Sequence, residues 1–281
     1  MVTRTQVAIV GGGPAGLMLS HLLARAGIES VVVDNRTRAQ IEQTVRAGIL
    51  ERDSVRLLVE SGVSDRVLRE GHEHAGIELA FGGGGHRIDF ADLVGASVWL
   101  YPQTDVFVDL ADARARDGGD VRFGVTDVAV EDITAARPGV RFTDADGVGQ
   151  ELRCDYLVGA DGSRSTCRRS VPEAAHRQFS REYPFAWFGI IVEAPVSAPE
   201  LIYNHSEHGF ALISQRTDSV QRMYFQCDPD EDAASWSDDR IWEQLQTRVG
   251  ANGHTLLEGP VVEKTVLRFR SFVNEPMRHG N

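Results

Sequence analysis

The chain has few cysteines and no long apolar run. Its three cysteines, Cys154, Cys167 and Cys227, are odd in number and contain no C-x-x-C pair. A disulfide framework and a zinc site are therefore disfavoured, no metal is implied, and a reducing cytoplasmic location is expected. No segment approaches the roughly 18 consecutive apolar residues of a membrane helix, and the first residues lack the pattern of a signal peptide. We expect a cytoplasmic protein with no membrane partner.

Basic residues are also in the minority. Lysine and arginine total 29 against 41 aspartates and glutamates, which gives a formal net charge of −12 over 281 residues. This balance argues against a nucleic-acid partner, and no local run of basic residues overrides it. There is no internal repeat or low-complexity segment. A hydrophobic content of 42% suffices for a core in one or two domains.

The N-terminus contains a complete unit of strand, glycine turn, helix and second strand. An apolar strand over 5–10 leads into Gly-Gly-Gly-Pro-Ala-Gly, a helix is predicted from Pro14 to about Ala26, and a valine-rich strand ends at Asp34. In such units the glycines form a tight turn, the helix N-terminus receives a pyrophosphate, and the acid accepts from a ribose hydroxyl. The predicted dinucleotide-binding residues are Gly11, Gly13, Pro14, Ala15, Gly16 and Asp34.

The remaining pattern is mixed. Further helices are predicted over 54–60, 106–116 and 238–249. Residues 121–157 have a strand-like pattern with a hairpin turn at 144–147, and short apolar strands are predicted at 188–192, 210–213 and 223–226. Four glycines at 82–85 predict a hairpin that joins the second group of strands. The fold class is α/β with mixed α+β character.

A second chemical signal lies at 154–165, where an apolar strand ends in Asp161-Gly162 and is followed by small residues and arginines. Taken alone, this could equally be a hairpin with solvated arginines. Downstream of a dinucleotide motif, however, it resembles the Asp-Gly motif of the flavoprotein aromatic hydroxylases. The resemblance implies that the dinucleotide is FAD.

The resemblance extends over essentially the whole chain. It is carried by stretches at 46–51, 103–105, 154–156, 183–187, 200–203, 209–216 and 270–277. It implies a Rossmann-like FAD-binding domain of the flavoprotein hydroxylase type and a β-sheet substrate domain. The expected division is 1–175 for FAD, with 72–97 contributing to the substrate sheet, 176–268 for substrate, and a return to the FAD domain over 269–281.

The implied activity is that of an FAD-dependent monooxygenase acting on a small aromatic carboxylate. It would hydroxylate 4-hydroxybenzoate at the 3-position to 3,4-dihydroxybenzoate, with O2 and NADPH or NADH, through a flavin hydroperoxide. Two alternatives stay open. One is a hydroxylase of another para-substituted benzoate such as 4-aminobenzoate, and the other is a catalytically incompetent nucleotide-binding fragment.

Three residues on or beside consecutive predicted strands can hold a benzoate carboxylate: Ser214, Arg216 and Tyr224. Arginine offers a planar, charge-assisted fork, and the two hydroxyls can satisfy the remaining lone pairs. These positions also match the carboxylate clamp of the family. A plain core role for Tyr224 is the alternative.

The resemblance assigns catalytic roles to Tyr203, His74 and Arg222. Tyr203 would bind the phenol oxygen of the substrate and favour the reactive phenolate. His74 would pass the phenol proton towards solvent, which suits a group that titrates near neutral pH. Arg222 would favour anionic reduced flavin. A packing tyrosine, a surface histidine and a solvated strand arginine are the respective alternatives.

For the cofactors, the resemblance adds several residues to the glycine turn. These are Arg46, Gln103, Asp161, Gly162, Arg164, Arg168 and Arg270. The family reads NADPH partly through an arginine at the position of Thr44, so this sequence leaves NADPH and NADH both open.

The family continues beyond the position of Asn281 into a further flavin-binding strand and C-terminal helices, so the sequence is expected to be part of a longer gene product. A homodimer is left open.

Overall fold

The computed structural model describes residues 2–44 and 48–281. The N-terminal unit begins with strand β1 (Val2–Val10), which leads through the glycine turn into helix α1 (Pro14–Arg25) and strand β2 (Ser30–Asp34). β1 and β2 are parallel, with Val7 opposite Ser30 and Val10 opposite Val33. The predicted strand, turn, helix and strand are confirmed.

A six-stranded sheet is built around this unit in the order β8-β2-β1-β11-β10-β9. β11 pairs in parallel with β1, whereas β10 and β9 continue the sheet in antiparallel fashion. Helix α6 packs beside α1 over a core that includes Leu17, Phe107 and Leu110. The further elements are β8 (Asp120–Phe123), β9 (Thr126–Glu131), β10 (Gly139–Thr143), β11 (Gly149–Gly159) and α6 (Gln103–Arg116).

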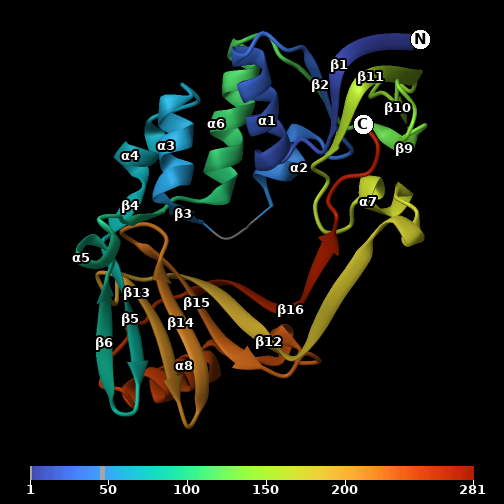
Figure 1. Cartoon of the computed structure of the whole chain (residues 1–281). Helices are drawn as coiled ribbons and strands as arrows, with labels where there is room; N and C mark the ends of the chain where they lie inside the picture. The colour runs from blue at the N-terminus through green and yellow to red at the C-terminus, as the bar shows by residue number, and fades with distance from the viewer. Residues whose placement is uncertain (1, 45–47) are drawn as a thin grey trace.

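A three-stranded sheet has the order β3-β7-β4, and in Figure 1 β3 and β4 lie between helices α3 and α4 and the strands of the seven-stranded sheet. The strands are β3 (Ile49–Glu51), β4 (His72–His74) and β7 (Val98–Leu100). The helices are α2 (Arg38–Glu42), α3 (Arg52–Glu60), α4 (Arg66–Glu70) and α5 (Phe90–Val94).

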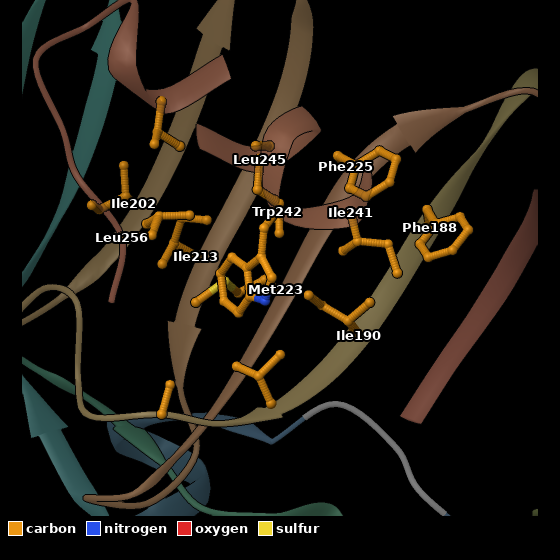
Figure 2. Packing of buried hydrophobic residues seen from close by; sticks show 14 of the residues in the cluster. Phe188, Ile190, Ile202, Ile213, Met223, Phe225, Ile241, Trp242, Leu245 and Leu256 are labelled. Atoms are coloured by element: carbon orange, nitrogen blue, oxygen red, sulfur yellow. The ribbon is translucent and has the colours of Figure 1, made fainter. Parts of the chain in front are cut away.

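The seven-stranded sheet has the order β16-β12-β15-β14-β13-β5-β6. Helix α8 (Asp238–Gly250) packs on one face, where Ile241, Trp242 and Leu245 join sheet residues in an apolar cluster (Figure 2). The strands are β5 (Gly76–Phe81), β6 (Gly84–Asp89), β12 (Arg177–Glu193), β13 (Leu201–Ser206), β14 (Gly209–Gln215), β15 (Val220–Cys227) and β16 (Val261–Glu275).

Two long antiparallel strands, β12 and β16, run from the region of helix α7 (Thr166–Ser170) to the seven-stranded sheet (Figure 1). Short 3-10 helices occur at Glu173–Ala175 and Ala233–Ser235. The last residue returns to the six-stranded sheet, where the amide of Leu157 donates to the carbonyl of Asn281 at 3.4 Å. The two sheets are therefore connected both by β12 and by β16.

The remaining helix and hairpin predictions are confirmed with small shifts at their ends. The helices predicted to start at 54 and 106 begin at Arg52 and Gln103, and the last helix ends at Gly250. The glycine-rich turn at 82–85 joins β5 to β6, and this hairpin lies at the edge of the seven-stranded sheet. None of the helices in the described ranges is long and apolar enough to cross a membrane.

Candidate active site

The glycine turn has the geometry of a dinucleotide cradle. Gly11 has a φ of 111°, and a Cβ there would lie 2.3 Å from the carbonyl oxygen of Ala160. A Cβ at Gly16 would lie 1.9 Å from the carbonyl oxygen of Gly11, so close packing of α1 on the turn requires glycine at this position. Gly13, the residue before α1, faces open space and offers no side-chain cap to the helix N-terminus. The turn therefore leaves uncapped helix N–H groups beside open space, which fits a pyrophosphate.

Asp34 is buried at the end of β2 and is already engaged within the chain. Its Oδ2 accepts from the amide of Gly12 at 2.8 Å, and its Oδ1 accepts from the amide of Arg36 at 2.9 Å. The guanidinium of Arg36 also pairs with Asp34, with Nη2 3.1 Å from Oδ2. A ribose hydroxyl would have to share this carboxylate with Arg36 or displace it.

The Asp-Gly turn follows β11 and begins the short helix α7. Oδ2 of Asp161 accepts from the amides of Thr166 and Cys167 at 2.6 and 3.1 Å. Its Oδ1 is buried and has no hydrogen-bond partner among the described residues. Gly162 has a φ of 72°, which favours glycine. The carboxylate of Asp161 therefore holds the turn against the first residues of α7.

Of the arginines predicted to bind the cofactors, Arg164 and Arg168 directly follow this turn in the chain. Arg164 and Arg270 are exposed, and Arg270 is on β16 opposite Glu182. Arg168 donates to the carbonyl of Ser163 at 2.6 Å and stacks 4.5 Å from the ring of Phe272. The arrangement is a basic surface next to the predicted FAD site.

A pocket of about 140 Å³ lies between the segment at 48–49 and 100–102 and the face of the seven-stranded sheet. It is smaller than the roughly 300–1,000 Å³ typical of sites for drug-sized ligands, which suits a single-ring ligand. Four of the predicted site residues line it together: Ser214, Arg216, Arg222 and Tyr224. The other lining residues are Gly48, Ile49, Leu100, Tyr101, Pro102, Trp187, Leu212 and Gln215.

Two arginines, Arg216 and Arg222, bring positive charge to this pocket. In the part of the chain that the structure describes, no carboxylate forms an ion pair with Arg216. The guanidinium of Arg222 lies 5.1 Å from the ring centre of Tyr224. Burial raises the pKa of Tyr224, and the positive charges of Arg222 and Arg216 oppose this shift. A pocket with aromatic walls and two arginines is suited to an aromatic anion.

Ser214 of the predicted clamp and Tyr203, the predicted contact of the phenol oxygen, are both engaged within the chain. The hydroxyl of Ser214 donates to the backbone carbonyl of Arg222 at 2.9 Å, so it must turn before it can donate to a substrate. Tyr203 is not among the residues that line the pocket. It packs beside Leu212 and Tyr224 in a small cluster, with its ring 6.3 Å from that of Phe210. The two tyrosines therefore lie on the same face of the sheet, on either side of Leu212.

His74 is buried at the end of β4, next to the start of β5. Burial lowers its pKa, and the carboxylate of Glu200 opposes this shift. Glu200 precedes β13, the strand that carries Tyr203, and accepts from Arg87 at 2.6 and 2.8 Å. The structure thus places His74 near the start of the Tyr203 strand, although no hydrogen bond joins the two residues in the described part of the chain.

The remaining predicted residues fall outside the pocket. Arg46 lies outside the described residues. Gln103 is exposed at the first position of α6, directly after Tyr101 and Pro102 of the pocket wall. It thus lies at a helix N-terminus beside the pocket. Its contact with FAD stays a prediction.

Sequence reasoning gave no site role to several pocket residues. Tyr101 is held by a hydrogen bond from its hydroxyl to Asp109 at 2.7 Å, and its amide donates to the carbonyl of Gly48 at 2.8 Å. Gln215 connects the pocket to β4, with its Nε2 3.2 Å from Nδ1 of His72. These contacts join residues that are 8 to 143 positions apart. No local pattern in the sequence could have indicated the longer-range ones.

A dinucleotide cradle and a cationic aromatic pocket in one chain are the features expected of a flavoprotein hydroxylase, and comparison with known proteins agrees. The model of the FAD binding domain family matches residues 4–281. The chain is 41% identical over 279 residues to p-hydroxybenzoate hydroxylase of Acinetobacter baylyi, across 99% of this chain and 69% of that protein. It is 32% identical over 175 residues to 3-(3-hydroxy-phenyl)propionate/3-hydroxycinnamic acid hydroxylase 2 of Burkholderia vietnamiensis, across 60% of this chain and 31% of that protein.

The chain therefore belongs to the FAD binding domain family, as an FAD-dependent aromatic hydroxylase of the p-hydroxybenzoate hydroxylase type. Solved structures support the fold. p-Nitrophenol 4-monooxygenase PnpA from Pseudomonas putida superposes with a TM-score of 0.80 at 20% identity, over 100% of this chain and 71% of that one. Aklavinone-11 hydroxylase with FAD and aklavinone superposes with a TM-score of 0.72 at 22% identity, over 98% and 55%. The expected fold class and FAD as cofactor are confirmed.

Proposed function

We propose that the protein hydroxylates 4-hydroxybenzoate at the 3-position. In the balanced reaction, 4-hydroxybenzoate, O2, NAD(P)H and a proton give 3,4-dihydroxybenzoate, water and NAD(P)+. One oxygen atom of O2 enters the ring and the other leaves as water. NAD(P)H supplies the two electrons.

The observation that carries the proposal is Arg216, a guanidinium in a small aromatic-walled pocket with no ion-pair partner among the described residues. A benzoate carboxylate supplies the missing negative charge and two oxygens for the planar fork. Tyr224 and Ser214 lie in the same pocket and can donate to that carboxylate. The 41% sequence identity to p-hydroxybenzoate hydroxylase supports the choice of a benzoate with a para hydroxyl.

The phenol end of the substrate is assigned to Tyr203 and His74. A phenol has a reference pKa of about 10, and its anion is the stronger nucleophile, so a hydrogen bond that stabilises the anion is catalytic. Tyr203 donates this hydrogen bond from the aromatic cluster next to Tyr224. His74, buried with a lowered pKa, is neutral at pH 7 and can accept a proton on its way out.

The FAD site is assigned to the glycine turn, Asp34 and the Asp161 turn. Bound FAD, once reduced by NAD(P)H, supplies the activated oxygen atom. The uncapped N-terminus of α1 would hold the pyrophosphate, and the Asp161 turn would border the cofactor. Arg222 sets a positive charge near the pocket. Arg164, Arg168 and Arg270 would hold the phosphates of the reductant.

The test is turnover by the FAD-loaded protein with each of three ring substrates. NADH and NADPH are supplied in parallel assays, and products are identified by chromatography. We expect 4-hydroxybenzoate to yield 3,4-dihydroxybenzoate, benzoate to yield no product, and 4-aminobenzoate to be turned over more slowly. Equal turnover of 4-hydroxybenzoate and 4-aminobenzoate, or turnover of neither, would contradict the assignment.

A further inference from the structure

A fully buried asparagine, Asn204, lies in β13 directly after Tyr203. It is on the face of the sheet covered by α8, the same face as Ile202, and it pairs across the strands with Ala211. An amide in such an apolar layer is unfavourable unless its hydrogen bonds are made. The contacts of this side chain therefore need an explanation.

The amide of Asn204 is satisfied at both ends. Its Nδ2 donates to the carbonyl of Arg248 in the last turn of α8 at 2.9 Å, and its Oδ1 accepts from Nδ2 of Asn252 at 2.8 Å. Asn252 follows α8 and is also buried. Its Nδ2 donates to the carbonyl of His205 at 3.0 Å, and its Oδ1 accepts from the amide of Gly83 at 2.9 Å. Two amide side chains thus connect β13, the end of α8 and the β5–β6 turn.

Tyr203 lies on the opposite face of the same strand. Successive side chains of a strand point to opposite faces, so Tyr203 packs with Leu212 and Tyr224 while Asn204 points towards α8. The two residues share a peptide bond. A shift of β13 that loosens the Asn204 contacts must therefore move the Tyr203 phenol.

Hydrogen bonds restrict this position more than apolar packing would. Leucine at 204 could slide within the cluster by small amounts, whereas two mutually bonded amides are satisfied in few arrangements. The neighbouring strands fix the register of β13 by backbone pairing. The amide pair adds an attachment from the α8 side, at the residue next to the phenol.

We propose that Asn204 and Asn252 are positioning residues that hold the Tyr203 phenol for its contact with the substrate oxygen. The inference rests on the proposed function, because it takes Tyr203 to be the residue that meets the phenol. Neither asparagine touches the substrate pocket. Their effect should therefore appear in the efficiency of oxygen transfer rather than in the binding of the benzoate.

The test compares Asn252→Asp and Asn204→Leu with the wild-type protein in its FAD-loaded form. Asn252→Asp keeps an acceptor for the amide of Gly83 and replaces the donor to Asn204 and His205 with a second carboxylate oxygen. Three quantities are measured: product formed per NAD(P)H consumed, the Kd for 4-hydroxybenzoate, and the pKa of the bound phenol from its phenolate absorbance.

We expect product per NAD(P)H to fall about three- to tenfold in both variants, since small displacements of a reacting group are costly. The pKa of the bound phenol should rise, and the Kd for 4-hydroxybenzoate should change less than about twofold. The control is Ile241→Val, in the same apolar cluster but in the first turn of α8. It should lower the Tm slightly without changing the product ratio or the pKa of the bound phenol.

Variants that lose stability yet keep the product ratio and the phenol pKa of the wild type would show that the amide pair is only structural, and would overturn the inference. The same loss of product ratio in Ile241→Val would overturn it too. A wild-type protein that does not hydroxylate 4-hydroxybenzoate would overturn the proposed function. The two failures are distinguished because the second is seen before any variant is made.

Discussion

The hydroxyl of Ser214 donates to the backbone carbonyl oxygen of Arg222 at 2.9 Å, across the antiparallel pair of β14 and β15. This contact holds the two strands together at the floor of the pocket. It also means that Ser214 gives up one hydrogen bond before it can donate to a ligand. Arg216, in the turn that follows β14, forms no ion pair with a described residue, so it loses none when a ligand binds. The two members of the predicted clamp should therefore contribute unequally.

Arg216→Lys should weaken 4-hydroxybenzoate binding by more than about tenfold, because a planar fork is replaced by a point charge. Ser214→Ala should weaken it less, since the net loss of one neutral hydrogen bond is about 0.5–1.5 kcal/mol. The FAD content of both variants should match the wild type. The measurement is a titration of FAD absorbance with 4-hydroxybenzoate. Normal affinity in Arg216→Lys would rule out the clamp as described.

Alanine substitutions at two glycines of the cradle should have different effects. A Cβ at Gly16 meets the carbonyl of Gly11 at 1.9 Å, so Gly16→Ala should lower the free energy of unfolding by about 1–3 kcal/mol or more. A Cβ at Gly13 meets nothing within 4 Å in the protein. Gly13→Ala should therefore keep its Tm without cofactor and yet lose at least about tenfold in FAD affinity, because the new methyl occupies the approach of the pyrophosphate.

Thermal melts of the FAD-free proteins and FAD titrations measure the two effects separately. A Gly13→Ala protein with normal FAD affinity would place the pyrophosphate elsewhere.

The stability of the protein should depend on pH through His74. Burial holds the pKa of folded His74 below its ordinary value of 6.5. Between that lowered pKa and 6.5, the unfolded chain binds a proton that the folded chain does not, so the free energy of unfolding falls as pH decreases through this window. The contribution is at most about 1.4 kcal/mol per pH unit.

In His74→Asn this contribution should disappear, so its stability should fall less steeply than that of the wild type below pH 6.5. His208→Asn, at an exposed site in the β13–β14 turn, is the control and should follow the wild type. Urea unfolding at a series of pH values measures the slopes. Equal slopes in His74→Asn and wild type would show that His74 does not titrate differently on folding.

Much of the nucleotide unit could be predicted from the sequence because its determinants are local. The glycine turn, α1 and β2 lie within 34 residues, and each has a backbone or capping requirement that a pattern reveals. The 82–85 hairpin was predicted for the same reason. The parallel pairing of β11 with β1 joins Cys154 to Thr5, and only the folded chain shows it.

In the candidate site, too, the features set by local sequence could be predicted and those set by long-range contacts could not. Ser214, Arg216 and Tyr224 were predicted from residue chemistry on neighbouring strands together with the family resemblance, and the structure brings them to one pocket. The opposite wall, which includes Tyr101 and Gly48, depends on contacts between distant segments. The carboxylate of Asp34 pairs with Arg36, and this pairing depends on a side-chain conformation that the motif does not specify.

Tyr203→Phe separates activation of the substrate from its binding. The variant loses only a hydroxyl, so 4-hydroxybenzoate should bind and stimulate NAD(P)H oxidation as before. A hydrogen bond to a charged oxygen is worth about 1.5–3 kcal/mol, so oxygen transfer should slow by about 10- to 150-fold. Reducing equivalents should then appear as hydrogen peroxide. The measurement is product per NAD(P)H, and a fully coupled variant would make Tyr203 an ordinary packing residue.

The central claim, that this chain inserts an oxygen atom of O2 into 4-hydroxybenzoate, is tested most directly by turnover under ¹⁸O2. The FAD-loaded protein is supplied with NAD(P)H and 4-hydroxybenzoate, and the product is analysed by mass spectrometry. The account predicts 3,4-dihydroxybenzoate that carries one ¹⁸O atom, and unlabelled product when ¹⁸O is supplied as water instead. Absence of 3,4-dihydroxybenzoate, or a product labelled from water, would contradict it.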